Sequence, residues 1–177
     1  LFFQLVALID IAVKNNQELA ILGQGLSEDV DLLLRKAALA YSDPDVAESF
    51  LDRAASTNAD HAAVLIARYR FYFYQGRLEE ALDVAESCLA KALRENGLPP
   101  DWREVEPDQA AFGDWGAVLP RFLLFSLKGW SYLRMRLGDL EAARVGIDKL
   151  LELDPTDKIG ATTLAQVLER GGRDDDG

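Results

Sequence analysis

The sequence contains one cysteine, Cys88, and one histidine, His61, among 177 residues. A single cysteine cannot form an intrachain disulfide, and no second cysteine or histidine is available to complete a conventional transition-metal site. We therefore expect neither a metal nor another cofactor. A lone thiol also fits a reducing compartment, so the sequence favours a cytoplasmic location.

Positive charge and long apolar runs are also scarce. The chain has 19 Lys and Arg against 30 Asp and Glu, a net charge of −11, which disfavours generic attraction to nucleic-acid phosphates and anionic lipids. The most apolar segment, residues 1–13, is too short to span a bilayer and carries Asp10. We interpret it as a buried helix, the alternative being a membrane anchor or signal remnant, and we expect neither nucleic acid nor a membrane as partner.

What the sequence does contain is helical periodicity, broken by frequent stop and start signals. In "SDPD", Asp43 is expected to cap a helix that begins at Pro44, where the missing proline N–H has no cost. No run shows the alternation of a strand. The pattern predicts a single all-α domain over residues 1–171, followed by a disordered acidic tail at residues 172–177.

Small residues recur at a fixed interval. Ala81 follows Ala47 at the same distance in the chain as Cys88 follows Ala54, and close helix packing favours small side chains at such positions. This interval is a period of about 34 residues, which is typical of helix-turn-helix repeats. A second repeated pattern is a short motif that occurs as "GRLEEAL" after Gln75 and as "GDLEAAR" after Leu137. The glycines of the two motif copies lie further apart than one period, and the additional residues correspond to a segment at about 94–121.

This pattern resembles the tetratricopeptide repeat (TPR) family. The best copy has Ala143, Ile147 and Pro155 at family positions, the second has Tyr72, Gly76 and Ala81, and the first is recognisable mainly by its register with the second. Some residues depart from the family pattern, among them Asp31, Arg35, Ala59, Arg68, Tyr69, Ala85 and Leu93.

The resemblance implies a short TPR-like helix-turn-helix solenoid of three repeats, at about 28–61, 62–95 and 124–157. A long insert at about 94–121 precedes the third repeat, and Pro120 is expected to open the helix after it. Solenoids need terminal helices that cover their end repeats, so we expect capping helices at residues 2–22 and at about 158–170.

The resemblance also implies that the first helix of each pair lines a concave, peptide-binding surface. Its expected rows combine basic and aromatic side chains, which suit an extended peptide with acidic groups or a free C-terminal carboxylate. The alternative is that the aromatic residues are core and the arginines merely extend outward from it. The candidate groove residues are Lys36, Arg70, Phe73, Tyr74, Lys128, Tyr132 and Arg136.

The insert carries three large aromatic residues, Trp102, Phe112 and Trp115, together with six acidic residues between Glu95 and Gly116. Three roles are open for it. It packs back against the concave face or its rim, it extends the core where the repeats are interrupted, or it recruits a partner.

Signals for catalysis are weak throughout the sequence. The "GQG" at residues 23–25 lacks the third glycine and the preceding strand of a dinucleotide site, and there is no P-loop. His61 is expected to be a surface or capping residue, and Cys88 an inert packing residue. We therefore expect a non-enzymatic interaction module, adaptor or chaperone-like, that binds a protein or peptide. The alternative is a structural protein that forms homo-oligomers through apolar end helices.

Overall fold

The structure, a computed structural model, describes residues 22 and 24–171, and within them the chain is helical with no strand. The helices are α3 (Glu28–Leu39), α4 (Pro44–Asn58), α5 (Ala62–Tyr74), α6 (Leu78–Glu95), η1 (Trp102–Glu104), α7 (Val118–Arg136), α8 (Leu140–Leu153) and α9 (Ala161–Glu169). The predicted all-α fold class is confirmed.

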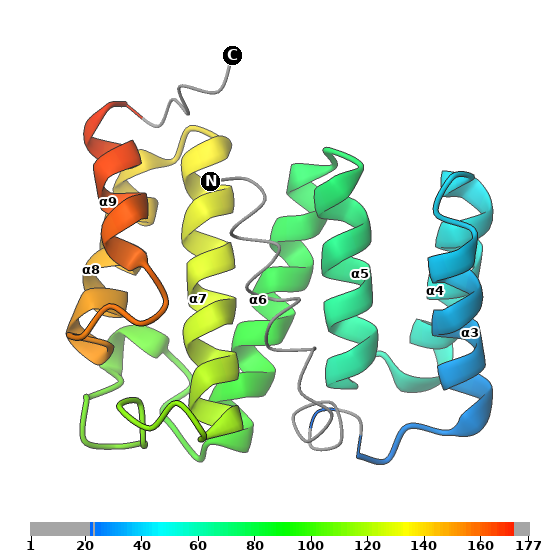
Figure 1. Ribbon diagram of the computed structural model, residues 1–177, viewed down its shortest axis with the longest axis horizontal. Helices are drawn as coiled ribbons and strands as arrows, with labels where there is room; N and C mark the ends of the chain where they lie inside the picture. Colours follow the sequence, from blue (N-terminus) through cyan, green and yellow to red (C-terminus); the bar gives the residue numbers. More distant parts are fainter. Residues whose placement is uncertain (1–21, 23, 172–177) are drawn as a thin grey trace.

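The α-helices follow one another as helix-turn-helix pairs (Figure 1). Within each pair α3 packs on α4, α5 on α6, and α7 on α8, while α4–α5 and α6–α7 contacts join successive pairs. The interval from the start of α3 at Glu28 to that of α5 at Ala62 equals the interval from α4 at Pro44 to α6 at Leu78. It is also the interval between the repeated small residues, so the first two pairs share the period found in the sequence.

The repeated glycine motif is a helix-ending turn used twice. Gly76 and Gly138 have left-handed φ angles of 71° and 87°, which glycine adopts without strain. After α5, Gly76 N donates to Phe73 O and Arg77 N to Tyr72 O, and after α7, Gly138 N donates to Met135 O and Asp139 N to Arg134 O. Equivalent backbone hydrogen bonds close both turns, so the repeated motif in the sequence reflects the same local turn geometry.

Two predicted helix starts are confirmed. Asp43 caps α4, its carboxylate accepting from Val46 N at 3.3 Å, and Pro44 is the first helical residue. His61 caps α5, where its Nδ1 accepts from Ala63 N at 3.2 Å and its Nε2 lies 2.9 Å from Gln24 O. The single histidine therefore has a structural task at the junction of the first two pairs.

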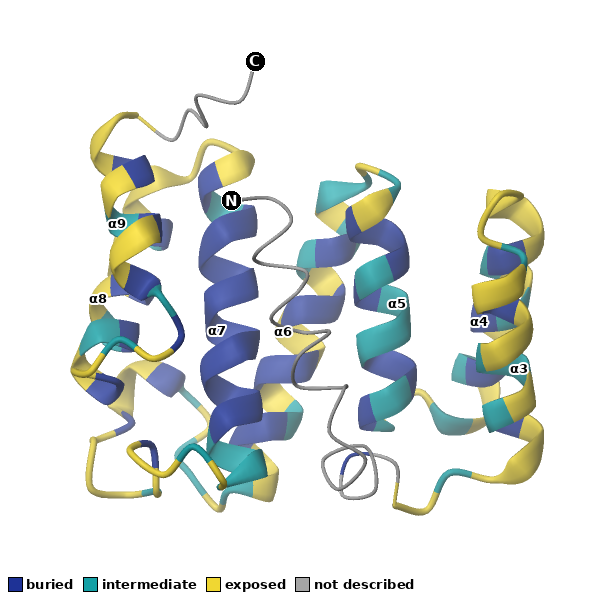
Figure 2. Cartoon of the chain, in the orientation of Figure 1, coloured by how far each residue is buried: buried dark blue, intermediate teal, exposed yellow. Residues whose placement is uncertain are grey.

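Small buried residues hold the helices close together. Ala47, Ala54, Ala81 and Ala143 have no exposed surface, and Cys88 is buried among them as expected. Figure 2 shows that α7 is buried along almost its whole length, in contrast to the outward face of α3. The centre of the core therefore lies around α7, between α6, α8 and α9.

The later boundaries match the sequence in part. α9 falls within the expected final helix at 158–170, but α7 begins at Val118, so Pro120 is its third residue and does not open it. A helix tolerates proline in its first turn, where the N–H has no intrahelical acceptor. The helices expected within residues 1–21 and the tail at 172–177 lie outside the described residues. Each described helix is too short or too polar to cross a membrane.

Candidate binding cleft

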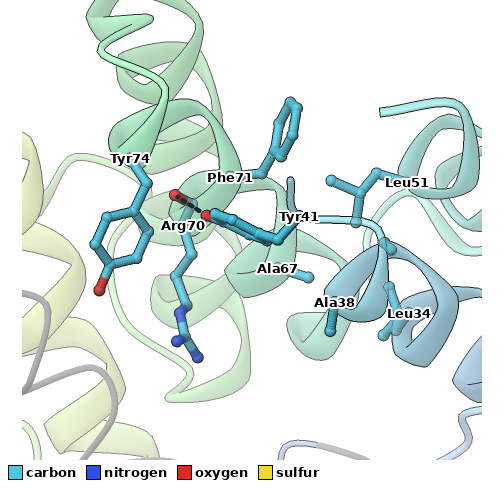
Figure 3. A pocket seen from close by; sticks show the side chains of 9 residues that line it. Leu34, Ala38, Tyr41, Leu51, Ala67, Arg70, Phe71 and Tyr74 are labelled. Atoms are coloured by element: carbon cyan, nitrogen blue, oxygen red, sulfur yellow. Dashed lines mark hydrogen bonds between the residues drawn. The ribbon is translucent and has the colours of Figure 1, made fainter. Parts of the chain in front are cut away.

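A cleft of about 410 Å³ lies between the first two helix pairs. Leu34 and Ala38 of α3, Leu51 of α4, and Arg70 and Tyr74 of α5 contribute to its walls, together with Tyr41 from the α3–α4 turn (Figure 3). Its volume falls within the range of roughly 300–1,000 Å³ typical of ligand pockets. It is therefore large enough to accept side chains of a partner.

Tyr41 joins the two sides of this cleft. Its ring makes edge contacts with Phe71 and Tyr74, each at 6.1 Å between centroids, and its hydroxyl donates to Arg70 O at 3.3 Å. Burial raises the pKa of Tyr41 to about 12, although the nearby Arg70 charge opposes the shift. The phenol is therefore neutral at physiological pH and brings no negative charge to the cleft.

A polar network ties α4 to the second pair. The Glu48 carboxylate accepts from Arg77 Nη1 at 2.6 Å and from the Tyr72 hydroxyl at 3.1 Å, and the Arg77 guanidinium lies 4.7 Å above the Tyr72 ring. The hydrogen bonds to Glu48 and Glu80 raise the pKa of Arg77 further above its usual range. This network therefore links α4 to α5 and to the turn after it.

Two aromatic side chains that line this cleft are partly exposed, Tyr41 at 39% and Tyr74 at 41%. Leu32 and Leu39 of α3 are 49% and 86% exposed, but they are not among the residues that line the cleft. Among the described residues that line the cleft, Arg70 is the only charged one. An exposed group of apolar side chains with one cation is typical of an interaction surface.

Two of the seven predicted groove residues, Arg70 and Tyr74, line this cleft. Lys36 belongs to α3 but lies against the α4 side, with Nζ 5.9 Å from the centre of the Phe50 ring. Arg136 is exposed at the end of α7, where its Nη1 donates to the Tyr132 hydroxyl at 2.8 Å.

The remaining three predicted groove residues are buried, which differs from the expected open row. Phe73 and Tyr132 are 2% and 0% exposed and face each other across α5 and α7, with ring centroids 5.8 Å apart. Lys128 is 5% exposed, and its Nζ donates to Ile159 O in the α8–α9 turn. Desolvation lowers the pKa of Lys128 to about 8, although Asp157 opposes the shift. The expected row assumed an open side on these helices, whereas neighbouring elements cover these three side chains in the structure.

The insert packs mainly as an extension of the core. Trp102 and Phe112 are buried, and the Trp102 ring meets Trp130 of α7 edge-on at 5.3 Å. Trp115 is half-buried, with its ring 6.0 Å from that of Phe125. Lysines from α8 and the turn after it donate to insert carbonyls, Lys149 to Val105 O and Lys158 to Gly113 O. Of the three roles left open by the sequence, these contacts favour the core extension.

Sequence reasoning did not identify Tyr41, Leu34 or Ala38 as cleft residues. The only available signal was an aromatic residue directly before the "SDPD" turn, and such a residue is as often core as surface. Their approach to α5 depends on how the first pair packs against the second, which local sequence does not encode.

Cys88 lies outside the cleft, in the interior of α6. Burial raises the pKa of its thiol to about 12, so at neutral pH it is protonated as well as inaccessible. Among residues 22 and 24–171, no cluster of three or more His, Cys, Asp or Glu has the arrangement of a metal site.

One curated protein is clearly similar to this chain. The "Uncharacterized 19.8 kDa protein in nifW 5'region" of Azotobacter chroococcum mcd 1 is 37% identical over 133 residues, which cover 75% of this chain and 74% of the relative. The chain belongs to the same family as this Azotobacter protein. No family model matches the sequence, and no solved structure matches the fold.

Proposed function

We propose that this protein is a non-enzymatic, TPR-like interaction module that binds a segment of a partner protein in the cleft between α3 and α5. The observation that carries the proposal is the cleft itself, which is largely apolar and includes the partly exposed side chains of Tyr41 and Tyr74. Soluble proteins rarely leave such side chains grouped in water unless they contact a partner. An adaptor or chaperone-like role in the cytoplasm is consistent with the acidic, cysteine-poor composition.

The TPR-like assignment is supported by the register of the first two helix pairs. Their helices begin at equivalent points of one period, and alanine or cysteine occupies the buried positions that the family reserves for small side chains. In this arrangement α3 and α5 are equivalent first helices, so the cleft lies between the facing sides of the first helices of neighbouring repeats.

Site-specific photocrosslinking in cells tests the proposed binding site. A benzoylphenylalanine is placed at Ala38, which is exposed and lines the cleft, or at Ala90, an exposed alanine of α6 that serves as matched control. We expect discrete adducts from position 38 that are absent from position 90. Identical adduct patterns at both positions would contradict binding in the cleft.

Gene context suggests one candidate for the partner. The name of the Azotobacter relative places it in the 5′ region of nifW, so the purified nifW product of that organism is a direct choice for a binding assay. Binding that is weakened by Ala38→Trp but not by Ala90→Trp would support the proposed site for that partner.

A second candidate function is self-association. Leu39 is 86% exposed and Leu32 49% exposed on the same helix, an arrangement that would also suit contact with another copy of the chain. Light scattering over a range of protein concentrations distinguishes the two functions. A concentration-dependent mass that falls on Leu39→Gln substitution would favour self-association, whereas a constant monomer mass would exclude it.

A further inference from the structure

The terminal helices of the row of described helices differ in what they expose. α3 and α4 form one end of this row, and α8 and α9 form the other (Figure 1). The exposed positions of α9 are all polar, as a helix that closes a solenoid requires: Thr162, Thr163, Gln166 and Glu169. α3 instead exposes two leucines, Leu32 at 49% and Leu39 at 86%. This helix therefore leaves apolar surface exposed that α9 does not.

The exposed leucines lie on the side of α3 that faces away from the cleft. Leu34 and Ala38 line the cleft, and at 3.6 residues per turn positions 32 and 39 fall on roughly the opposite side of the helix. Leu32, Arg35 and Leu39 are spaced by three and four residues, as are the residues through which helices pack side by side in coiled coils. We call this second surface the outer face of α3, and its exposed residues are Glu28, Asp29, Leu32, Arg35, Lys36 and Leu39.

Charges of opposite sign lie on the two sides of Leu32 along this face. Glu28 and Asp29 precede Leu32 by four and three residues, and Arg35 and Lys36 follow it by three and four. When the outer face meets a second copy that runs in the opposite direction, the acidic residues of each copy lie beside the basic residues of the other. A parallel arrangement would instead bring like charges together, so the charges favour antiparallel contact.

The local ion pair on this face is compatible with such a contact. Arg35 donates from Nε to Asp31 at 2.8 Å, yet its side chain is 74% exposed. An exposed pair within one helix contributes little to stability. The guanidinium therefore stays within reach of a carboxylate of a second copy while it is bonded to Asp31.

We propose that the protein forms a two-fold symmetric homodimer in which the outer faces of two α3 helices pack antiparallel, with Leu32 at the two-fold axis. Leu32 packs on Leu32 of the second copy, and Leu39 of each copy reaches the start of the other α3, where Leu26 is half-buried. A two-fold interface needs a surface that is complementary to itself, and the outer face meets this requirement. The proposal rests on self-association, the second candidate function, and specifies its surface; binding in the cleft does not depend on it.

Two single helices form a small interface. α3 has 12 residues, so the buried area lies at the low end of specific interfaces and we expect a dissociation constant in the micromolar range. In such an interface the charges determine the direction of pairing more than its strength.

Engineered cysteines test the direction and the register of the pairing. In the proposed dimer the two copies of position 32 lie within disulfide distance, whereas the two copies of position 39 are roughly 20 Å apart along the helices. We expect Leu32→Cys to form a disulfide-linked dimer under mild oxidation. Leu39→Cys and Ala90→Cys, an exposed position of α6, should remain monomeric on a non-reducing gel, and the native Cys88 is buried. Crosslinking at both 32 and 39 would indicate parallel pairing and overturn the proposal.

Charge reversal tests whether the acidic and basic residues meet. Light scattering over a range of concentrations compares Glu28→Lys/Asp29→Lys, Arg35→Glu/Lys36→Glu and an equimolar mixture of the two. Each variant alone places like charges opposite each other, so we expect its dimer to be at least about tenfold weaker than that of the wild type. In the mixture the opposed charges again differ in sign, and the affinity should return to within about threefold of the wild type. Each variant has the same altered helix alone and in the mixture, so changed helix stability cannot produce this recovery.

The outcomes separate this interface from self-association in general. A wild type that stays monomeric at every concentration would overturn both and leave the exposed leucines to a different occupant. A dimer that is unaffected by either charge variant and does not crosslink at position 32 would overturn the α3 interface but leave self-association intact.

Discussion

Gly146, in the interior of α8, gives the sharpest test of the packing between α7 and α8. A Cβ at this position would overlap Ser131 Oγ and lie 3.1 Å from Cζ3 of Trp130. Both neighbours are buried, and Ser131 Oγ is held by a hydrogen bond to Leu127 O at 2.8 Å. The two helices therefore approach each other as closely as they do only because this residue has no side chain.

Gly146→Ala has two opposing effects on the free energy of unfolding. Replacing a mid-helix glycine by alanine adds about 1 kcal/mol of helix stability. Overpacking in a filled core costs about 1–3 kcal/mol, and the overlap with Ser131 predicts a value in the middle of that range. We therefore expect a net loss of about 1 kcal/mol.

The double variant Gly146→Ala/Ser131→Ala isolates the close contact. Removing Oγ relieves the overlap, so the second change should restore most of the lost stability, with a coupling of about 1–2 kcal/mol between the two sites. Urea unfolding, monitored by circular dichroism, measures the free energy of unfolding of the wild type and of each variant. Gly113→Ala is the matched control, because nothing lies within 4 Å of a Cβ there, and it should stay within about 0.5 kcal/mol of the wild type. A stabilised Gly146→Ala that does not respond to Ser131→Ala would refute the close approach of α7 and α8.

Three further predictions concern a cap, a thiol and a lysine. Asp43→Ala removes the α4 cap and should cost about 1 kcal/mol in urea unfolding, whereas Asp52→Ala, an exposed change within the same helix, should cost much less. Because burial raises the pKa of its thiol to about 12, Cys88 of the folded protein should react with iodoacetamide at pH 8 at least about 1,000-fold more slowly than an ordinary thiol. In urea, where the chain is unfolded, the reaction should proceed at the normal rate. Rapid labelling of the folded protein would contradict the burial of Cys88. The pKa of Lys128 is lowered to about 8 by burial, so the unfolded chain binds more protons between pH 8 and 10.5 and stability should rise with pH in that window. Parallel urea titrations measure the free energy of unfolding of the wild type and of Lys128→Met at pH 7 and pH 10. The free energy of the wild type should increase by about 2 kcal/mol more than that of the variant between these pH values. If the difference between the two proteins is the same at both pH values, the lysine is solvated.

Local features of this fold could be predicted from the sequence because they depend on a few neighbouring residues. Asp43 and Pro44 begin a helix through a side-chain cap and a fixed φ angle, and Gly76 ends one because the left-handed turn suits glycine. The register of the first two pairs was likewise visible in the small residues that recur at a fixed interval, such as Ala47 and Ala81. These signals predicted the all-α class, the start of α4 and the position of the final helix, α9.

The binding surface was predictable only in part. Arg70 and Tyr74 were expected on the open side of α5 and do line the cleft, but Phe73, Lys128 and Tyr132 were expected beside them and are buried. A helical period assigns residues to one side of a helix, whereas exposure depends on which elements cover that side. The burial of Lys128 depends on a distant turn that supplies the acceptor at Ile159.

The sequence by itself therefore determined the all-α class, the signals that begin α4 and end α5, and the regular spacing of the small residues in the first two helix pairs. The tertiary structure alone decided that Trp102 of the insert packs on α7, that Tyr41 bridges to α5, and that a cleft stays open beside Arg70. The physical reason is the range of the interactions. Caps and turns act over a few residues, whereas burial and cleft shape depend on contacts between residues distant in the chain.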